Sequence, residues 1–291
     1  MGRYARAVRA LSLCVAVLAL AGCSGGDDDA APTTPTTTAS GTTSTPTETG
    51  GVASTTPLRV YFVRLERMGA AGREVQATPA VGAAALRELL AGPTAEDKSA
   101  DLGSEIPSGT KLNGLTIDNG VATVDLSKAF ESGGGSTSMQ LRVAQVVYTL
   151  TQFPSVKRVQ FKIDGKPVEA IGGEGVVVDP PVGRKAFEKQ TPAILVESPT
   201  PGSVVTSPLR VRGTANTFEA TLNLRLLDGS GKVLYDNFTT ATSGSGTRGT
   251  FEQTIPFTIS KDGPGTLVAY EHSAADGSEI NVVRIPVELR R

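Results

Sequence analysis

The stretch Leu115-Thr-Ile-Asp-Asn-Gly-Val-Ala-Thr-Val124 decides how the first half of this chain folds. Two short runs with β-branched residues, 115–117 and 121–124, flank the dipeptide Asn119-Gly120. A type I′ turn needs positive φ at both of its central residues, which Asn and Gly adopt with the least strain. The stretch therefore predicts a tight antiparallel β-hairpin.

Before this hairpin, the sequence predicts one strand and one helix. Residues 58–65 are rich in β-branched and aromatic side chains, which favours a strand. In residues 81–90, apolar side chains recur at helical spacing, and Gly92-Pro93 ends the predicted helix.

After the hairpin, the sequence predicts a second helix and a further strand. Residues 139–152 are apolar on more than one side, which is typical of a largely buried helix. In residues 159–163, apolar and polar side chains alternate as they do in a strand. The order strand, helix, hairpin, helix, strand predicts an α+β domain over residues 58–171, with two helices on one face of a small, mostly antiparallel sheet.

These segments resemble the GerMN domain, which was first named in a spore germination and sporulation protein. The resemblance implies an α/β fold similar to the ring-building motifs of secretion and sporulation complexes, and an envelope or sporulation role. It implies no established catalytic residue. The matching stretches are Val60-Tyr-Phe62, Ala85-Leu-Arg-Glu-Leu-Leu-Ala-Gly-Pro93, Ile106-Pro-Ser-Gly-Thr-Lys-Leu112, Asn119-Gly-Val-Ala-Thr-Val-Asp-Leu-Ser127 and Val147-Tyr-Thr-Leu-Thr-Gln-Phe-Pro154.

A second domain is predicted over residues 192–291, after a connector at 172–191. Helical periodicity is lost here, and about seven short strands follow, the number expected of an immunoglobulin-like sandwich. This part contains neither Cys nor Trp, so aliphatic and Phe side chains must form its core. The predicted strands are 193–196, 209–213, 220–227, 233–239, 251–258, 267–271 and 280–289.

This second part resembles the immunoglobulin-like domain that accompanies GerMN modules in bacterial lipoproteins. The pairing of the two resemblances, in this order, covers most of the chain after residue 57. The matching stretches are Ser198-Pro-Thr-Pro-Gly-Ser-Val-Val-Thr-Ser-Pro208, Val211-Arg-Gly-Thr-Ala215, Phe218-Glu-Ala220, Arg248-Gly-Thr-Phe251 and Glu271-His-Ser-Ala-Ala-Asp-Gly277.

The first 22 residues have the features of a signal peptide. Three arginines precede an apolar run at 10–21, and about a dozen apolar residues are too few to span a bilayer of ~30 Å. The run ends in Leu20-Ala-Gly-Cys23, which resembles a bacterial lipobox. That resemblance implies cleavage after Gly22 and a diacylglycerol thioether with a further acyl chain, such as palmitate, on Cys23. An ordinary signal peptide with a Cys near its cleavage site is the alternative.

Residues 23–57 are predicted to be a lipidated Cys followed by a disordered tether. Thr, Ser, Gly, Pro and Ala dominate residues 24–57, which contain neither Lys nor Arg. Such a segment cannot bury enough apolar surface to offset the entropy lost on ordering. Asp27-Asp28-Asp29 is interpreted as a solvated charge cluster rather than a metal-binding run.

The composition excludes several classes of function. The 28 Lys and Arg nearly balance the 29 Asp and Glu, which argues against nucleic-acid binding. A single His excludes a three-His zinc site. Of the two Cys, Cys14 leaves with the signal peptide and Cys23 is lipidated, so no thiol remains for a disulfide, a nucleophile or an iron–sulfur cluster. We predict no cofactor and no metal ion.

The single imidazole, that of His272, lies beside Glu271 and near Asp276, which suggests a catalytic or metal-binding group. Adjacent residues on a strand point to opposite faces, so Glu271 and His272 cannot easily share one ligand. A Ser–His–Asp triad would also need a Gly-x-Ser-x-Gly turn, which does not accompany it. We therefore predict an edge-strand or surface histidine.

Three further sequence patterns are candidates for a functional site. Ser132-Gly-Gly-Gly-Ser136 is glycine-rich but lacks the Lys of a phosphate-binding loop, so a mobile loop is predicted. Near the end of the predicted helix, three side chains either line a groove or belong to the core and the helix cap: Tyr148, Gln152 and Phe153. Asp118 and Asp125 are either paired carboxylates, as in glycosidases, or solvated residues that flank the hairpin.

We therefore predict no enzyme, but a binding or scaffolding lipoprotein on the extracytoplasmic face of the membrane. Its expected partners are the membrane, through the lipid, and an envelope protein or peptidoglycan, with strand addition at an exposed sheet edge as one mode of contact. The alternative is a peptidoglycan- or small-ligand-binding accessory, or a cell-wall hydrolase, that uses the α+β domain.

Overall fold

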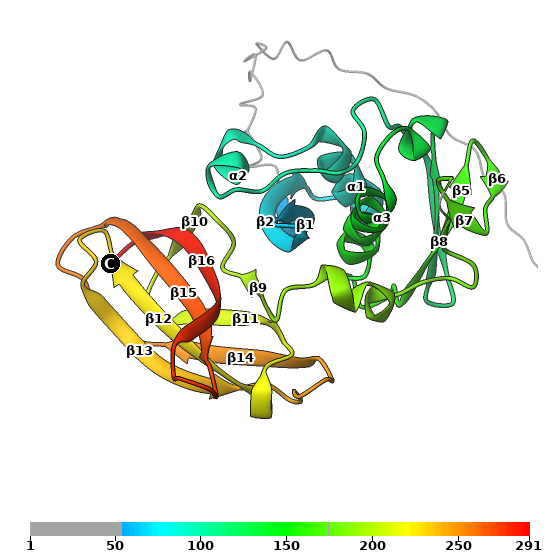
Figure 1. Ribbon diagram of the computed structural model, residues 1–291. Helices are drawn as coiled ribbons and strands as arrows, with labels where there is room; N and C mark the ends of the chain where they lie inside the picture. The colour runs from blue at the N-terminus through cyan, green and yellow to red at the C-terminus, as the bar shows by residue number, and fades with distance from the viewer. Residues whose placement is uncertain (1–53, 174) are drawn as a thin grey trace, which may run out of the picture. The chain divides into compact units, whose positions relative to one another are not determined.

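The computed structural model describes residues 54–173 and 175–291 (Figure 1). The predicted signal peptide 1–22, its cleavage after Gly22, the lipidated Cys23 and most of the tether 23–57 lie outside the described residues. The last residues assigned to the tether do not belong to it. Strand β1 (Thr55–Arg64) begins before residue 58, because Thr55, Thr56 and Pro57 pair with the next strand.

That next strand, β2 (Arg67–Gln76), was not predicted from the sequence. It pairs antiparallel with β1 through a tight turn in which Leu65 and Glu66 have φ of 50° and 57°. Its sequence is rich in Gly and Ala, which are depleted in strands. Small residues are needed here because a Cβ at Gly69 would lie 2.6 Å from Cδ2 of Leu102.

The predicted hairpin is confirmed as part of a four-stranded sheet. Its strands are β3 (Leu112–Asp118) and β4 (Val121–Leu126), and Asn119 and Gly120 have φ of 47° and 82°. Strand β5 (Arg158–Ile163) pairs parallel with β4, and β6 (Lys166–Pro167) closes the order β3-β4-β5-β6 with an antiparallel pairing.

Both predicted helices are present, together with a short one between them. Helix α1 (Val81–Ala91) buries one face and ends at Gly92, whose φ is 84°. Helix α2 (Ala95–Ser99) begins with a capping box between Thr94 and Asp97. Helix α3 (Ser136–Leu150) is buried along most of its length.

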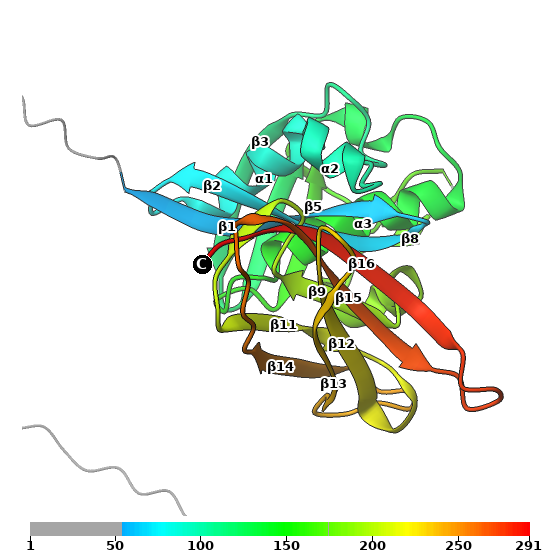
Figure 2. The same cartoon turned by 90° about the vertical axis from the view of Figure 1, so that its left-hand side faces the viewer.

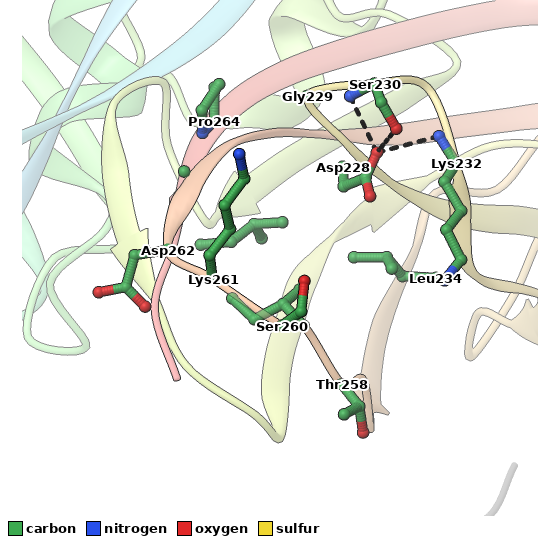
Figure 3. A pocket seen from close by; sticks show the side chains of 13 residues that line it. Asp228, Gly229, Ser230, Lys232, Leu234, Thr258, Ser260, Lys261, Asp262 and Pro264 are labelled. Atoms are coloured by element: carbon green, nitrogen blue, oxygen red, sulfur yellow. Dashed lines mark hydrogen bonds between the residues drawn. The ribbon is translucent and has the colours of Figure 1, made fainter.

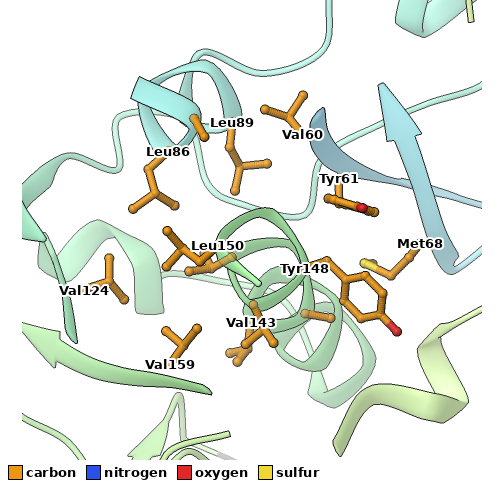
Figure 4. Packing of buried hydrophobic residues seen from close by; sticks show 14 of the residues in the cluster. Val60, Tyr61, Met68, Leu86, Leu89, Val124, Val143, Tyr148, Leu150 and Val159 are labelled. Carbon is orange, nitrogen blue, oxygen red and sulfur yellow. The ribbon is translucent and has the colours of Figure 1, made fainter. Parts of the chain in front are cut away.

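Helix α3 is the centre of the first core. Figure 4 shows it between β1, which contributes Val60 and Tyr61, and the sheet side chains of Val124 and Val159. The predicted α+β class is confirmed. Its strands form more than one sheet, because β1 pairs only with β2.

The segment predicted as a connector, 172–191, is built into the structure. It contains strand β8 (Val176–Val177), which pairs with β7 (Ala170–Ile171), and a 3-10 helix, η2 (Arg184–Gln190). Val178 and Phe187 are buried in the first core. Burial of these apolar side chains is the reason why the segment is ordered rather than a plain linker.

The second domain is the predicted immunoglobulin-like sandwich. One sheet has the order β14-β11-β9 and the other β10-β16-β15-β12-β13, with β15 and β16 side by side in Figure 2. The unpredicted strand is β10, three residues long and parallel to β16. The strands are β9 (Ile194–Ser198), β10 (Ser203–Val205), β11 (Leu209–Ala215), β12 (Thr221–Asp228), β13 (Val233–Thr240), β14 (Gly249–Ile255), β15 (Gly263–His272) and β16 (Glu279–Leu289).

Candidate functional site

The structure places Glu271 and His272 on opposite faces of β15, as the strand argument predicts. Glu271 is buried and accepts a hydrogen bond from the backbone N–H of Phe218 (3.2 Å). His272 is exposed, and its Nδ1 lies 2.9 Å from the carbonyl oxygen of Gly277. Asp276 accepts hydrogen bonds within its own turn. The three side chains do not converge on one point.

The glycine-rich loop 132–136 surrounds a buried arginine that the sequence analysis did not single out. The guanidinium of Arg142 donates to the carbonyl oxygens of Phe130 (2.6 Å), Ser132 (3.1 Å) and Gly133 (3.1 Å). Burial lowers the pKa of Arg142. Two carbonyl groups of the loop therefore bind this cation, while residues 132–136 are themselves exposed, and the mobility of the loop stays a prediction.

Tyr148, Gln152 and Phe153 do not line a groove. Tyr148 is 1% exposed, and Phe153 packs against the first core. The side-chain amide of Gln152 accepts from the backbone N–H of Arg59 (2.8 Å) and donates to its carbonyl oxygen (2.6 Å). Gln152 thereby ties the end of α3 to β1.

Asp118 and Asp125 serve local turns. Asp118 accepts from the side-chain amide of Asn119 (2.9 Å), and Asp125 accepts from the backbone N–H of Gly165 (3.0 Å). Across residues 54–173 and 175–291, no three His, Cys, Asp or Glu side chains come together in a way that could hold a metal ion. Within these same ranges, no helix is long and apolar enough to cross a membrane.

A polar cluster joins the two domains. Arg184 of η2 donates through Nη1 to Oε1 of Glu197 on β9 (2.7 Å) and through Nη2 to the hydroxyl of Tyr61 on β1 (3.1 Å). The Tyr61 hydroxyl in turn donates to the same carboxylate. We call Tyr61, Arg184 and Glu197 the interdomain triad.

Aromatic rings enclose the guanidinium of this triad. Its Cζ lies 5.1 Å from the ring centroid of Tyr61 and 4.6 Å from that of Tyr148. Cation–π contacts of this kind become stronger where the cation is desolvated. Its Nε also donates to Oγ1 of Thr151 (2.9 Å), so all three nitrogens of the guanidinium have partners.

A second hydrogen-bonded link runs from α3 to the start of the second domain. The hydroxyl of Tyr148 lies 2.5 Å from Oγ1 of Thr191, and that threonine donates to the carbonyl oxygen of Phe187 (2.8 Å). A threonine hydroxyl has one proton to donate, so Tyr148 is the donor of the first bond. The cluster therefore fixes both η2 and the chain that enters β9.

The electrostatics of the interdomain triad favour one charge state. Burial, and then the carboxylate of Glu197, raise the pKa of Tyr61 to about 12, so its hydroxyl is neutral. Burial alone would raise the pKa of Glu197, but Arg184 and the Tyr61 hydroxyl outweigh it and hold that pKa below its usual value. Burial likewise acts to lower the pKa of Arg184, yet Tyr61 and Glu197 raise it. A neutral phenol thus bridges a stable ion pair.

A cleft of about 630 Å³ opens beside the triad, between the β1–β2 hairpin and the β9–β10 segment. Arg59 and Glu197 line it, together with Gly72 and Thr200, whose chains approach closely. A Cβ at Gly72 would lie 2.5 Å from Oγ1 of Thr200. A side chain at residue 72 would therefore require Thr200 to move.

Sequence reasoning missed the triad. Tyr61 lies in the predicted strand 58–65, but Arg184 falls in the segment taken as a connector, and Glu197 follows a predicted strand as an ordinary charged residue. Tyr61 lies 123 residues and Glu197 13 residues from Arg184 in the sequence, so no local spacing pattern points to the cluster. The useful signal was Phe187, a large apolar residue within a supposed linker.

The fold and the triad define a two-domain protein in which an α+β domain is held by buried polar contacts against an immunoglobulin-like domain. Residues 46–169 match the Germane family, described as sporulation and spore germination. Residues 193–278 match Gmad2, the immunoglobulin-like domain of bacterial spore germination. The chain therefore contains a Germane (GerMN) domain followed by a Gmad2 domain, as the two resemblances predicted.

Several solved structures are similar to parts of this chain. The tandem GerMN domains of the sporulation protein GerM from Bacillus subtilis are 19% identical, with a TM-score of 0.41; the match covers 72% of this chain and 64% of that one. The first GerMN domain of GerM is 24% identical over 45% of this chain and 98% of its own, with a TM-score of 0.39. A candidate lipoprotein from Clostridium perfringens is 22% identical over 46% and 91%, with a TM-score of 0.34. No curated protein matches the chain.

Proposed function

We propose that this protein is a membrane-anchored, non-catalytic binding or scaffolding module of the bacterial cell envelope. The observation that carries the proposal is the interdomain triad. Its partly buried ion pair and bridging phenol link the two domains, which suits a protein that presents a composite surface to a partner. The family descriptions support a role in an envelope process of the sporulation or germination type.

The hydrogen bonding of the polar groups that are candidates for catalysis also supports this proposal. Glu271, Asp118 and Asp125 accept hydrogen bonds from neighbouring turns and backbone. Groups engaged in this way are poor general acids or bases, because a catalytic carboxyl must face the reacting atoms. The arrangement favours recognition over turnover.

One edge of the sandwich supports contact with a protein partner. Strand β13 ends the five-stranded sheet, and its Val233 and Phe238 are 51% and 63% exposed. An edge strand has unpaired backbone groups that can add a strand from another chain. Apolar side chains along that edge would add buried area to such a contact.

The test of the non-catalytic role uses residues 51–291 and labelled peptidoglycan. We expect no release of soluble fragments above a buffer control, whether or not the protein is retained on the sacculi. Release that depends on the protein would contradict the proposal and would favour a cell-wall hydrolase.

The proposed anchor is tested with a pair of cysteine variants in the producing cell. Cys23→Ala should move the protein from the membrane fraction to the soluble fraction, because acyl chains supply the membrane affinity. Cys14→Ala is the matched control, since it lies within the predicted signal peptide and should leave the membrane fraction unchanged. Retention of the Cys23→Ala protein in the membrane would refute the lipid anchor.

A further inference from the structure

A pocket of about 710 Å³ lies at one end of the immunoglobulin-like domain, away from the interdomain triad. Its walls are the turn between β12 and β13, residues 228–232, and the loop before β15, residues 258–264. Its volume falls in the range of sites that bind small molecules, about 300 to 1,000 Å³. Neither the family descriptions nor the triad accounts for it.

The walls of this pocket are held in place by their own hydrogen bonds. Oδ1 of Asp228 accepts from the backbone N–H and hydroxyl of Ser230 (2.9 and 2.6 Å) and from the backbone N–H of Lys232 (3.0 Å). The turn also meets the opposite loop, because a Cβ at Gly229 would lie 2.9 Å from Cγ of Pro264. A pocket with fixed walls loses little entropy when it binds a ligand.

The charged groups that line the pocket are unequally engaged. Asp262 is engaged by Nη1 of Arg290 (3.2 Å) and the backbone N–H of Arg291 (3.0 Å). In the part of the chain that the structure describes, no carboxylate lies within 4.0 Å of the ammonium group of Lys232 or Lys261. The lining therefore holds two lysines and two carboxylates, Asp228 and Asp262; the carboxylates already accept hydrogen bonds, and the two lysines retain capacity for an anion.

The rest of the lining is apolar with a few hydroxyl groups. Leu234 and Ile259 provide aliphatic surface above the buried Leu289, and Ser230, Thr258 and Ser260 provide hydroxyls. Figure 3 shows Lys261 and Lys232 on opposite sides, with Leu234 and Ser260 between them. The lining suits a ligand that has both an anionic end and an aliphatic body.

We propose that this pocket binds a short aliphatic peptide through its terminal carboxylate. The terminal carboxylate forms an ion pair with one of the two ammonium groups at short range. The alkyl side chains of the peptide cover the leucine and isoleucine surface. Inorganic phosphate offers charge without an apolar body and is the weaker fit. The proposal deepens the binding role proposed above and rests on it.

The experiment titrates the full chain, purified in detergent micelles, with acetyl-alanyl-alanine by calorimetry. The free carboxylate should bind at least about tenfold more tightly than the C-terminal amide of the same dipeptide, since only the carboxylate can pair with the lysines. This comparison uses the unaltered chain, so it does not depend on the folding of any variant. The D,D and L,L forms distinguish a cell-wall peptide from an ordinary one as the source.

The matched variants test the lysines themselves. The double change Lys232→Gln with Lys261→Gln should weaken binding of the carboxylate about tenfold and leave binding of the amide unchanged. Lys166→Gln, an exposed change on β6 in the other domain, should leave both unchanged.

Three results would overturn the proposal: equal affinity for carboxylate and amide, unchanged affinity in the double variant, or phosphate binding as tight as that of the dipeptide. Failure to bind the dipeptide would count against this pocket alone. Release of peptidoglycan fragments in the earlier test would count against the non-catalytic role alone.

Discussion

Arg184 connects side chains from three separate parts of the chain. Its guanidinium contacts Tyr61 of β1, Thr151 just after α3 and Glu197 of β9. Removing one partner of an ion pair leaves the other charge without compensation, at a cost that rises with burial. Arg184 is therefore one of the main contributors to the domain contact, beside Arg248, which pairs with Glu188 of η2.

The first prediction is the effect of Arg184→Met on the free energy of unfolding. The substitution keeps much of the side-chain volume but removes the cation that pairs with Glu197, while the Tyr61 hydroxyl continues to donate to that carboxylate, so we expect a loss of about 2 kcal/mol. Urea unfolding followed by circular dichroism measures it. Arg158→Met is the control, because Arg158 is exposed on β5, and a loss of equal size there would contradict the role of Arg184.

The second prediction concerns acid. The pKa of Glu197 is lowered in the folded protein, so its ionised form contributes stability above the unfolded-state value of about 4.3. That contribution is lost as the pH falls through the lower folded-state pKa. Glu197→Gln should therefore be less stable than the wild type at pH 7, and the difference should shrink toward about pH 3.

The measurement is urea unfolding at a series of pH values. Glu66→Gln, an exposed carboxyl in the turn between β1 and β2, serves as the control and should follow the wild-type curve. A constant difference between Glu197→Gln and the wild type at all pH values would show that ionisation of Glu197 does not matter.

Single residues also show where prediction from sequence stops. Helical spacing placed Arg142 in a buried helix, but periodicity does not reveal that its guanidinium takes the carbonyl oxygens of a glycine-rich loop. The sequence therefore did not reveal that this loop binds a cation. A buried cation is recognisable only when the partner carbonyls, which carry no sequence signal, are known.

At the scale of elements, the hairpin between β3 and β4 is set by its own sequence. Asn119 and Gly120 adopt the left-handed conformations that a type I′ turn requires, with φ of 47° and 82°. The pattern is local, so it could be found without knowledge of the rest of the fold. The same holds for α1, α3 and β5, where apolar spacing reports a buried face.

The third prediction is that Gly120→Ala destabilises the protein by about 1 to 2 kcal/mol, the cost of left-handed backbone for a residue with a Cβ. The space itself is sufficient, since the new Cβ would be 3.5 Å from Cγ of Lys157. Gly114→Ala on β3 is the matched control. Its Cβ would meet nothing within 4 Å and its φ is not positive, so we expect a change within about 0.5 kcal/mol. Equal effects in urea unfolding would contradict the backbone explanation.

Strands β2 and β10 are among the elements that escaped prediction, because their sequences carry a weak or contrary local signal. Strand β2 contains Gly69 and Gly72 with two alanines, a composition that disfavours strands. These small residues are selected by close packing against Leu102 and Thr200, which are distant in the sequence. Strand β10 is too short, at three residues, to show an alternating pattern.

At the scale of the whole described part of the chain, the two domains and their order could be predicted from the sequence. The contact between the domains could not. Each domain has its own hydrophobic core, and the spacing of apolar residues in the sequence indicates which segments form it. The contact between them depends on Tyr61, Arg184 and Glu197, and on a glycine at the closest approach of the two chains. The proposed pocket was missed for a similar reason, since its lysines come from two separate turns.

The last prediction tests whether the close approach of Gly72 to Thr200 couples the domains. In Gly72→Ala, the new Cβ would lie 2.5 Å from Oγ1 of Thr200, so either Thr200 must rotate or the chains must separate. We expect a loss of about 1 to 3 kcal/mol, as for other overpacked contacts. The wild type should unfold in one calorimetric transition, and Gly72→Ala in a broader or a double one.

The matched change Thr200→Ala makes this prediction specific. It removes Oγ1 and leaves Cβ, which lies 3.6 Å from the added methyl position, an ordinary contact. The double variant should therefore recover most of the stability lost in Gly72→Ala, with a coupling energy of at least about 0.5 kcal/mol. If the two losses simply add, the glycine is needed within β2 itself and the domain contact does not depend on it.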